Sequence, residues 1–488
     1  MRRNIGGLFG FFVLAFLLVS VALLYWQVIR APTLLAREDN PRPVEEAKKV
    51  TRGRILDRTG QELARSLMSR SSTPGHQAGY VKRFYSYPPL SPVIGYWSSR
   101  YGPAGIEAAE DGHLSGRARA NPQELWDRFL HRPQVGDDVV LTVDLALQKV
   151  VEAALGKGSG AAVVLNPRTG AILAMASHPY FDANNIESDW EKIKADPARP
   201  LLNRATQGLY PPGSTFKTVT LAAALEQGVV TATTPFSYTL LPPGGVHKVA
   251  WHQNDYVSCE NHPGKSSFDL SGAYAWSCNV AFSEIGLKMG PDTYLEYARR
   301  FGLEEALPLE IPTEVSRAYR RPDYFFGQER FYALASTAFG QGELAITPLQ
   351  MALISAAIAN NGAMPRPHLV NRVQSREGQV LATTVPRIWR ISVSPAAASQ
   401  AKAIMVYSVD SGWASKAQIK GVKVGGKTGT AESGDFKARP HSWFIGFAPA
   451  EDPRLAIAVI KEFAGYGSEE AAPAAKKIME AALALPGD

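Results

Sequence analysis

Three short runs of residues in this sequence combine a hydroxyl group with a lysine or an amide, which are the groups that nucleophilic catalysis needs. In chain order they are Ser214-Thr215-Phe216-Lys217, Ser277-Cys278-Asn279 and Lys427-Thr428-Gly429-Thr430. A serine hydroxyl attacks a carbonyl only after a base takes its proton, and a lysine is such a base when burial and nearby cations lower its pKa. The three runs therefore predict a serine acyl-transfer site in which Lys217 activates Ser214.

The residues around Ser214 place it at the start of a helix. Tyr210-Pro211-Pro212-Gly213 has the composition of a turn, and good helix formers follow from Thr215 to Gln227. Unpaired backbone N–H groups and the helix dipole favour developing negative charge there, and Lys217 lies one turn further on the same face. Taken alone, this run is also compatible with a structural role, in which Ser214 only caps the helix and Lys217 is solvated.

The third run lies in a stretch with the composition of a strand. Gly425 and Gly426 precede it, and small residues allow a substrate backbone to approach a strand edge closely. Residues 421–428 also match the pattern of a phosphate-binding loop, which would indicate an ATPase. Such a loop must open a helix, and residues 429–440 have no helical periodicity, so the ATPase hypothesis is disfavoured.

The elements that must position these runs form an α+β pattern. Early strands are predicted at 139–143, 161–165 and 171–175, a helix-rich middle includes 215–227 and 347–359, late strands are predicted at 421–432, 441–448 and 454–463, and a helix at 469–485 closes the chain. Strands at both ends of a helical middle predict one central antiparallel sheet with helices packed against it.

The beginning of the chain predicts a membrane anchor and an outer portion. Residues 5–29 carry no charge and are long enough to cross a bilayer, and Arg2 and Arg3 place the N-terminus in the cytoplasm. We therefore expect a single-pass membrane protein whose catalytic part is extracytoplasmic. Three parts are predicted: 1–30 as the cytoplasmic tip and anchor, 31–138 as a stalk and a small irregular domain, and 139–488 as the catalytic domain.

Charge and composition exclude several classes of function. The net charge of +7, from 52 basic and 45 acidic residues, is spread along the chain, with no basic run and no nucleic-acid-binding motif. The nine histidines show no metal-ligand spacing, so no metal and no cofactor are expected.

Further segments carry a family resemblance that spans nearly the whole chain. They are Arg52-Gly53-Arg54-Ile55 with Asp57-Arg58 and Gly60, Tyr87-Pro88, Gly95-Tyr96, Gly105-Ile106-Glu107, Leu141-Thr142-Val143-Asp144, Gly340-Gln341-Gly342, Thr347-Pro348-Leu349-Gln350 and Asn360-Asn361-Gly362. With the three runs, they resemble the class B penicillin-binding proteins, the monofunctional peptidoglycan D,D-transpeptidases, and most of all the short-pedestal actinobacterial type. The resemblance implies a pedestal at 31–138 and a catalytic domain similar to the serine β-lactamases.

The resemblance also implies a role for each residue of the runs. Ser214 would attack the carbonyl between the terminal D-Ala residues of a peptidoglycan stem peptide, with Lys217 as its base. Ser277, supported by Lys427, would relay a proton to the leaving amine, and Asn279 would orient the substrate amide and Lys217. Thr428, Gly429 and Thr430 would bind the terminal carboxylate and the backbone of the substrate, and backbone N–H groups of Ser214 and Thr430 would form the oxyanion hole. β-Lactams would acylate Ser214 and inhibit.

Alternatives within and outside this chemistry remain to be weighed. A hydrolytic β-lactamase would need a deacylating glutamate in an E-x-x-L-N loop, which we do not find. A D,D-carboxypeptidase shares the acylation chemistry, and a scaffold role could coexist with catalysis. A β-lactam sensor is disfavoured because about four residues precede the anchor. We expect a SEDS-type membrane polymerase as the partner that makes the glycan, in cell-shape or division synthesis.

The two cysteines suggest a tether beside the site. Cys259 and Cys278 form a pair in a compartment expected to be oxidising, and Cys278 lies inside the second run. We predict a disulfide between them; the alternative is two buried thiols.

Overall fold

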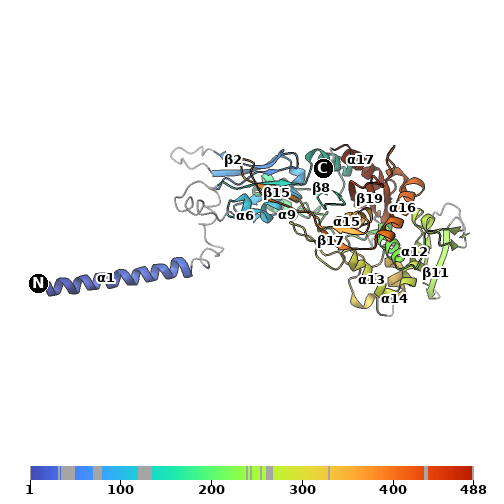
Figure 1. Ribbon diagram of the computed structural model, residues 1–488, viewed down its shortest axis with the longest axis horizontal. Helices are drawn as coiled ribbons and strands as arrows, with labels where there is room; N and C mark the ends of the chain where they lie inside the picture. Colours follow the sequence, from blue (N-terminus) through green and yellow to red (C-terminus); the bar gives the residue numbers. More distant parts are fainter. Residues whose placement is uncertain are drawn as a thin grey trace.

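The computed structural model describes residues 2–30, 33, 50–69, 80–118, 135–237, 240–241, 245–252, 255–259, 267–327, 330–432 and 438–485. Helix α1 (Arg2–Leu24) continues into a π-helical turn, η1 (Tyr25–Ile29). Together they contain, over Gly6–Ile29, one helix long and apolar enough to cross a membrane, with a mean hydropathy of 2.7. The outer part is an α+β body, as predicted, and its two subdomains lie at opposite ends in Figure 1.

The pedestal is built on a six-stranded mixed sheet to which two distant parts of the chain contribute. Its order is β16-β15-β6-β1-β2-β3, with bounds Val380–Thr383, Val370–Gln374, Asp138–Leu141, Ile55–Leu56, Glu62–Ser69 and Tyr80–Tyr85. β1 pairs with β6 in parallel, and β15 pairs with the other edge of β6. The predicted boundary at 138/139 therefore falls inside β6, in a sheet that catalytic-domain residues complete.

Short elements close the pedestal around a buried ionic cluster. They are η2 (Pro88–Leu90), α4 (Ser91–Ile94), β4 (Trp97–Ser98), β5 (Gly102–Pro103), α5 (Ile106–Ala109) and α6 (Asp111–Leu114). Glu107 on α5 is fully buried, with its carboxylate 2.9 Å from Arg52 and 2.6 Å from Arg83. Because removing one partner of a buried pair leaves an uncompensated charge, this cluster makes the fold sensitive to its members.

The arginine-rich segment near residue 55 also anchors the catalytic domain. One carboxylate oxygen of Asp57 accepts hydrogen bonds from the backbone of Thr59 and Gln61, and the other accepts from the backbone of Leu145. Leu145 is the first residue of α8 (Leu145–Leu155), whose N-cap is Asp144, as predicted. The pedestal turn and the first helix of the catalytic domain therefore share one carboxylate.

The catalytic sheet is antiparallel throughout, which confirms the predicted arrangement. Its order is β18-β19-β20-β7-β8, with bounds Gly425–Ala431, His441–Ala448, Leu455–Lys461, Gly160–Leu165 and Ile172–His178. The two ends of the domain meet where β20 pairs with β7. Successive residues of β7 alternate between two cores, because side chains along a strand point to opposite faces: Val163 belongs to one cluster and Val164 to the other.

Helices cover both faces of this sheet. α8 and the closing helix α17 (Ala471–Leu483) pack on one face, and α15 (Pro348–Ala359), buried along its whole length, packs on the other. The remaining elements are η3 (Ala183–Asn185), α9 (Ile186–Ala195), η4 (Gly213–Phe216), α10 (Lys217–Glu226), β9 (Phe236–Ser237), β10 (Leu240–Leu241), β11 (Gly245–His252), β12 (Asp255–Cys259), β13 (Ser267–Phe268), α11 (Leu270–Ala275), α12 (Asn279–Met289), α13 (Pro291–Arg300), η5 (Pro322–Tyr324), α14 (Arg330–Ala338), β14 (Ala363–Pro365), β17 (Ile388–Ile391), α16 (Pro395–Ser411) and η6 (Ser415–Ala417).

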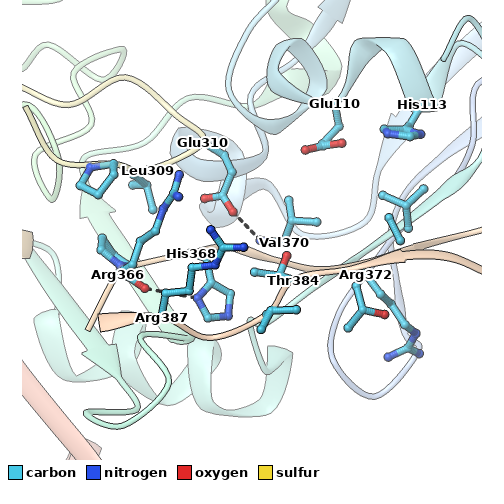
Figure 2. Close-up of a pocket in the computed structure, with 16 residues that line it drawn as sticks. Glu110, His113, Leu309, Glu310, Arg366, His368, Val370, Arg372, Thr384 and Arg387 are labelled. Atoms are coloured by element: carbon cyan, nitrogen blue, oxygen red, sulfur yellow. Dashed lines mark hydrogen bonds between the residues drawn. The ribbon is translucent and has the colours of Figure 1, made fainter. Parts of the chain in front are cut away.

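A cavity of about 530 Å³ lies at the junction of pedestal and catalytic domain. Figure 2 shows Glu110 and His113 of the pedestal on one side and Arg366 and His368 of the catalytic domain on the other. The carboxylate of Glu310 accepts hydrogen bonds from the backbone that leads into β15. None of the three predicted runs lines this cavity, so it is separate from the chemistry that follows.

Candidate active site

Ser214 lies in a tight turn that feeds directly into a helix. It belongs to the 3₁₀ segment η4, and α10 begins at Lys217, two residues later than the helix start that we predicted. The side chain of Thr215 donates to the carbonyl of Pro212 at 2.6 Å, and the indole of Trp443 donates to the carbonyl of Pro211 at 3.1 Å. These bonds fix the turn from inside and from the neighbouring strand β19.

Lys217 makes the contacts that the chemistry requires. Its ammonium nitrogen is 2.7 Å from Ser214 Oγ, 2.7 Å from Asn279 Oδ1 and 3.3 Å from Ser277 Oγ. The first two predicted runs, about sixty positions apart in the chain, therefore meet at one nitrogen atom, which stands within proton-transfer distance of both hydroxyl groups.

The surroundings of Lys217 favour its neutral form. Its side chain is completely buried. Burial lowers the pKa of Lys217 to about 7, against a smaller opposing effect of the thiols of Cys259 and Cys278. A lysine with this pKa is partly deprotonated at neutral pH, and a neutral amine can take the Ser214 proton.

The third run reaches Ser214 because small residues let backbones approach one another. A Cβ atom at Gly429 would lie 2.9 Å from the side chain of Thr215 and 3.0 Å from the carbonyl of Pro212. Gly213 has φ +54, and a Cβ there would lie 2.7 Å from the carbonyl of Thr430. Strand β18 is thus pressed against η4, and a larger residue at either position would push them apart.

Lys427 is the second buried cation of the site. Its ammonium group donates to the carbonyl of Thr428 at 3.1 Å and lies 5.6 Å from the Tyr274 ring centroid. Burial, and after it the charge of Lys217, lower the pKa of Lys427 well below its usual value. Among the described residues no hydrogen bond joins Lys427 to Ser277, so its support of a relay through Ser277 remains a prediction.

Strand β18 offers a free edge beside the turn that carries Ser214. It is the first strand of its sheet and pairs, among the described strands, with β19 alone. Thr428 is nearly buried, whereas Thr430 is partly exposed and accepts a weak hydrogen bond from the backbone of Gly467 at 3.4 Å. An unpaired edge of this kind can hold an extended peptide through backbone hydrogen bonds.

The two cysteines lie together beside the second run. Their sulfur atoms are 3.2 Å apart, both side chains are buried, and both are free thiols in this structure. Cys259 Sγ accepts a hydrogen bond from the backbone of Asn279 at 2.9 Å. The structure brings the pair together, as the sequence suggested, without the predicted covalent bond, which stays a prediction.

Sequence reasoning missed residues that hold the runs in place. Trp443 and Tyr274 carry no motif, and a tryptophan or tyrosine in a buried strand or helix is ordinarily read as core. Gly340 was noted as part of the resemblance, but its function is structural: it has φ +97, and a Cβ there would lie 1.7 Å from the carbonyl of Gly213. A glycine pair flanking a glutamine was the available signal for this close approach.

Comparisons with known proteins agree with this geometry. Residues 160–480 match the family model described as the penicillin binding protein transpeptidase domain, and residues 52–139 match the penicillin binding protein A dimerisation domain. The chain is 36% identical over 480 residues to the peptidoglycan D,D-transpeptidase PbpA of Mycolicibacterium smegmatis, covering 94% of each chain. It is 35% identical, with the same coverage, to PbpA of Mycobacterium tuberculosis.

Solved structures of penicillin-binding protein A are also similar to this chain. The ceftriaxone acyl-enzyme complex of penicillin-binding protein A from M. tuberculosis superposes with a TM-score of 0.78 at 34% identity, over 90% of this chain and all of that one. The imipenem acyl-enzyme of the same protein gives the same TM-score and identity.

Proposed function

We propose that this chain, which belongs to the class B penicillin-binding proteins, is a peptidoglycan D,D-transpeptidase that works through an acyl-serine intermediate at Ser214. The observation that carries the proposal is the buried amine of Lys217, in hydrogen-bond contact with Ser214, Ser277 and Asn279. Relatives named peptidoglycan D,D-transpeptidase, and a relative solved as a ceftriaxone acyl-enzyme, support the same reaction class.

Acylation begins with transfer of the Ser214 proton to the neutral amine of Lys217. Ser214 Oγ then forms a bond to the carbonyl carbon between the two terminal D-Ala residues, and the carbonyl oxygen becomes an oxyanion. The backbone N–H groups of Ser214 and Thr430 are proposed to donate to it, and one such donor contributes about 10²–10³ in rate.

The tetrahedral adduct collapses when the carbon–nitrogen bond breaks. The departing amine takes a proton from Ser277, which recovers one from Lys217 across their 3.3 Å contact, so the protons balance. Lys427 supports this transfer electrostatically. The amine of a neighbouring stem peptide then attacks the acyl carbon and loses its proton through the same relay, Ser214 leaves with a proton, and the cross-link is complete.

Substrate binding is assigned to β18. The terminal carboxylate is proposed to bind Thr428 and Thr430, with positive charge from Lys427, whose protonated form the bound carboxylate would stabilise, and the peptide backbone to lie along the free edge beside Gly429. Asn279 holds Lys217 at 2.7 Å and orients the substrate amide. A β-lactam would enter as a mimic of D-Ala-D-Ala and acylate Ser214.

The N-terminal anchor indicates on which side of the membrane the reaction takes place. The N-terminal apolar helix fits a single-pass membrane protein. We place its N-terminus in the cytoplasm, because Arg2 and Arg3 precede the span, and the catalytic domain outside the cytoplasm. A SEDS-type membrane polymerase is the partner proposed to supply glycan strands; co-purification of the two from detergent, with a helix-deleted variant as control, tests this.

One experiment tests the central proposal. The outer portion, from about residue 50, is incubated with a fluorescent penicillin, and covalent label is followed on a denaturing gel for wild type and Ser214→Ala. Stable stoichiometric label on wild type alone is expected. Rapid turnover of label would indicate a β-lactamase, and no label on folded wild type would overturn the assignment. Incubation with a D-Ala-D-Ala stem peptide and an amine acceptor then separates cross-linking from carboxypeptidase activity.

A further inference from the structure

The backbone that carries Ser277 has an unusual shape. Ser277 has φ +61, in the left-handed region that favours glycine and costs an L-residue about 1–2 kcal/mol. It follows Trp276, the C-cap of α11, and its N–H donates to the carbonyl of Tyr274 at 3.0 Å, while the N–H of Cys278 donates to that of Ala273 at 2.8 Å. These two bonds form a Schellman motif, in which Ser277 occupies the position usually held by glycine.

A helix end leaves carbonyl groups without partners inside the helix, and the Schellman bonds satisfy only some of them. The two that remain next to Ser277 belong to Ala275 and Trp276. Both accept from a single residue, Trp413: its backbone N–H donates to Ala275 at 3.2 Å, and its indole Nε1–H donates to Trp276 at 3.1 Å. One tryptophan therefore completes the hydrogen bonding of the turn that carries Ser277.

The loop after α16 is fitted closely to this turn. A Cβ at Gly412 would lie 2.4 Å from the carbonyl oxygen of Ala275, so only glycine admits the approach. The rings of Trp276 and Trp413 meet edge to face, with centroids 5.4 Å apart and planes at 81°. Packing and hydrogen bonds thus act on the same two residues that precede Ser277.

We propose that Trp413 is a positioning residue for proton delivery: it holds the Ser277 turn in its left-handed conformation, with Ser277 Oγ at 3.3 Å from Lys217 Nζ. A turn released from this conformation would carry the hydroxyl away from Lys217, because a change in φ at Ser277 rotates its own side chain. The inference rests on the proposed role of Ser277 in protonating the leaving amine.

The test compares two leaving groups on one enzyme. Trp413→Phe keeps a ring against Trp276 and the backbone N–H, and removes the indole donor. Each variant is assayed on two substrates. One is an acyl-D-Ala-D-Ala peptide, in which an amide bond joins the two alanines, and the other is the matched thioester, in which a thiolate replaces the leaving amine. The amine must be protonated to leave, whereas a thiolate leaves without a proton. Trp389→Phe, the same change at a partly buried indole on β17, is the control.

The expected result is a loss of about tenfold in kcat/KM on the amide, as for one lost hydrogen bond that aligns a reacting group; kcat/KM reports acylation and not the deacylation that both substrates share. The thioester should lose less than threefold, and Trp389→Phe should resemble wild type on both. Equal losses on amide and thioester would indicate a merely structural role, and wild-type rates on the amide would overturn the inference. Penicillin labelling of the same samples measures the reactivity of Ser214 itself. If wild type labels normally, the proposed function stands whichever way Trp413→Phe behaves. Thermal unfolding confirms that the variant is folded.

Discussion

Lys217 on α10 and Lys427 on β18 are both completely buried in one site, and the protonated form of each disfavours the protonated form of the other. Burial is the larger cause of the low pKa of Lys427, and the charge of Lys217 adds to it. The pair therefore favours a state in which at least one amine is neutral. The coupling therefore acts on Lys427, whereas the neutral form that Lys217 needs as a general base comes from its own burial.

The rate of acylation is expected to follow the titration of Lys217. Burial lowers its pKa to about 7, and only the neutral amine can take the Ser214 proton. The second-order rate constant for penicillin should therefore rise about tenfold per pH unit well below pH 7 and level off above it. Labelling kinetics from pH 5 to pH 9 measure this, and a rate that does not change across that range would remove Lys217 as the base.

The same lowered pKa predicts a dependence of stability on pH. Between pH 7 and 10.5 the unfolded chain binds more protons at Lys217 than the folded chain does, so the folded state gains stability as pH rises. The gain is at most about 1.4 kcal/mol per pH unit. Lys217→Met should lose this contribution, so that its unfolding free energy climbs less steeply than that of wild type between pH 7 and 9 in urea titrations. Parallel curves would contradict the assignment.

Gly340 offers a test of the close approach behind the nucleophile. Gly340 and Gly378 have nearly the same φ, +97 and +92, but a Cβ at Gly340 would lie 1.7 Å from the carbonyl of Gly213, whereas Gly378 has nothing within 4 Å. Gly378→Ala should cost only the backbone strain, about 1–2 kcal/mol, and keep the wild-type acylation rate. Gly340→Ala should destabilise more and slow acylation at least a hundredfold. Similar behaviour of the two variants, in melting temperature and labelling rate, would show that η4 is not held as described.

Breaking the buried ionic cluster of the pedestal should lower the free energy of unfolding far more than breaking a surface ion pair. Burial alone would raise the pKa of Glu107, but Arg83 and Arg52 more than offset this and lower it. Glu107→Gln removes the charge between two buried guanidinium groups and should cost about 3–5 kcal/mol of unfolding free energy. Glu62→Gln, which affects the more exposed pairs with Arg65 and Arg54, should cost about 0–1 kcal/mol. Denaturant unfolding of both variants makes the comparison, and equal costs would contradict it.

The predicted disulfide can be tested directly by mass. The sulfur atoms of Cys259 and Cys278 lie 3.2 Å apart, so little movement separates the thiol pair from a bond. Protein isolated from an oxidising compartment, denatured without reductant and treated with an alkylating agent, should take up no label until it is reduced. Two labelled thiols before reduction would remove the disulfide and leave the buried thiol pair.

The sequence by itself determined the features that depend on local chemistry. Asp144 caps α8 as predicted, because an N-cap needs only a short acceptor side chain just before the helix. Strand β19 spans His441–Ala448 as predicted, and the turn before Ser214 followed from its prolines and glycine. The types and spacing of Ser214, Lys217, Ser277, Asn279 and Lys427 predicted acyl-transfer chemistry, and the comparisons support that class.

Only the tertiary structure decided how those residues work together. The low pKa of Lys217 comes from burial among side chains distant in sequence, which no local pattern encodes. The pedestal sheet takes β15 and β16 from beyond the catalytic helices, a pairing that requires long-range register. The two hydrogen bonds from Trp413 to the Ser277 turn join residues more than a hundred positions apart. Contacts of this kind arise when the chain packs, because they depend on which surfaces meet rather than on what each segment prefers alone.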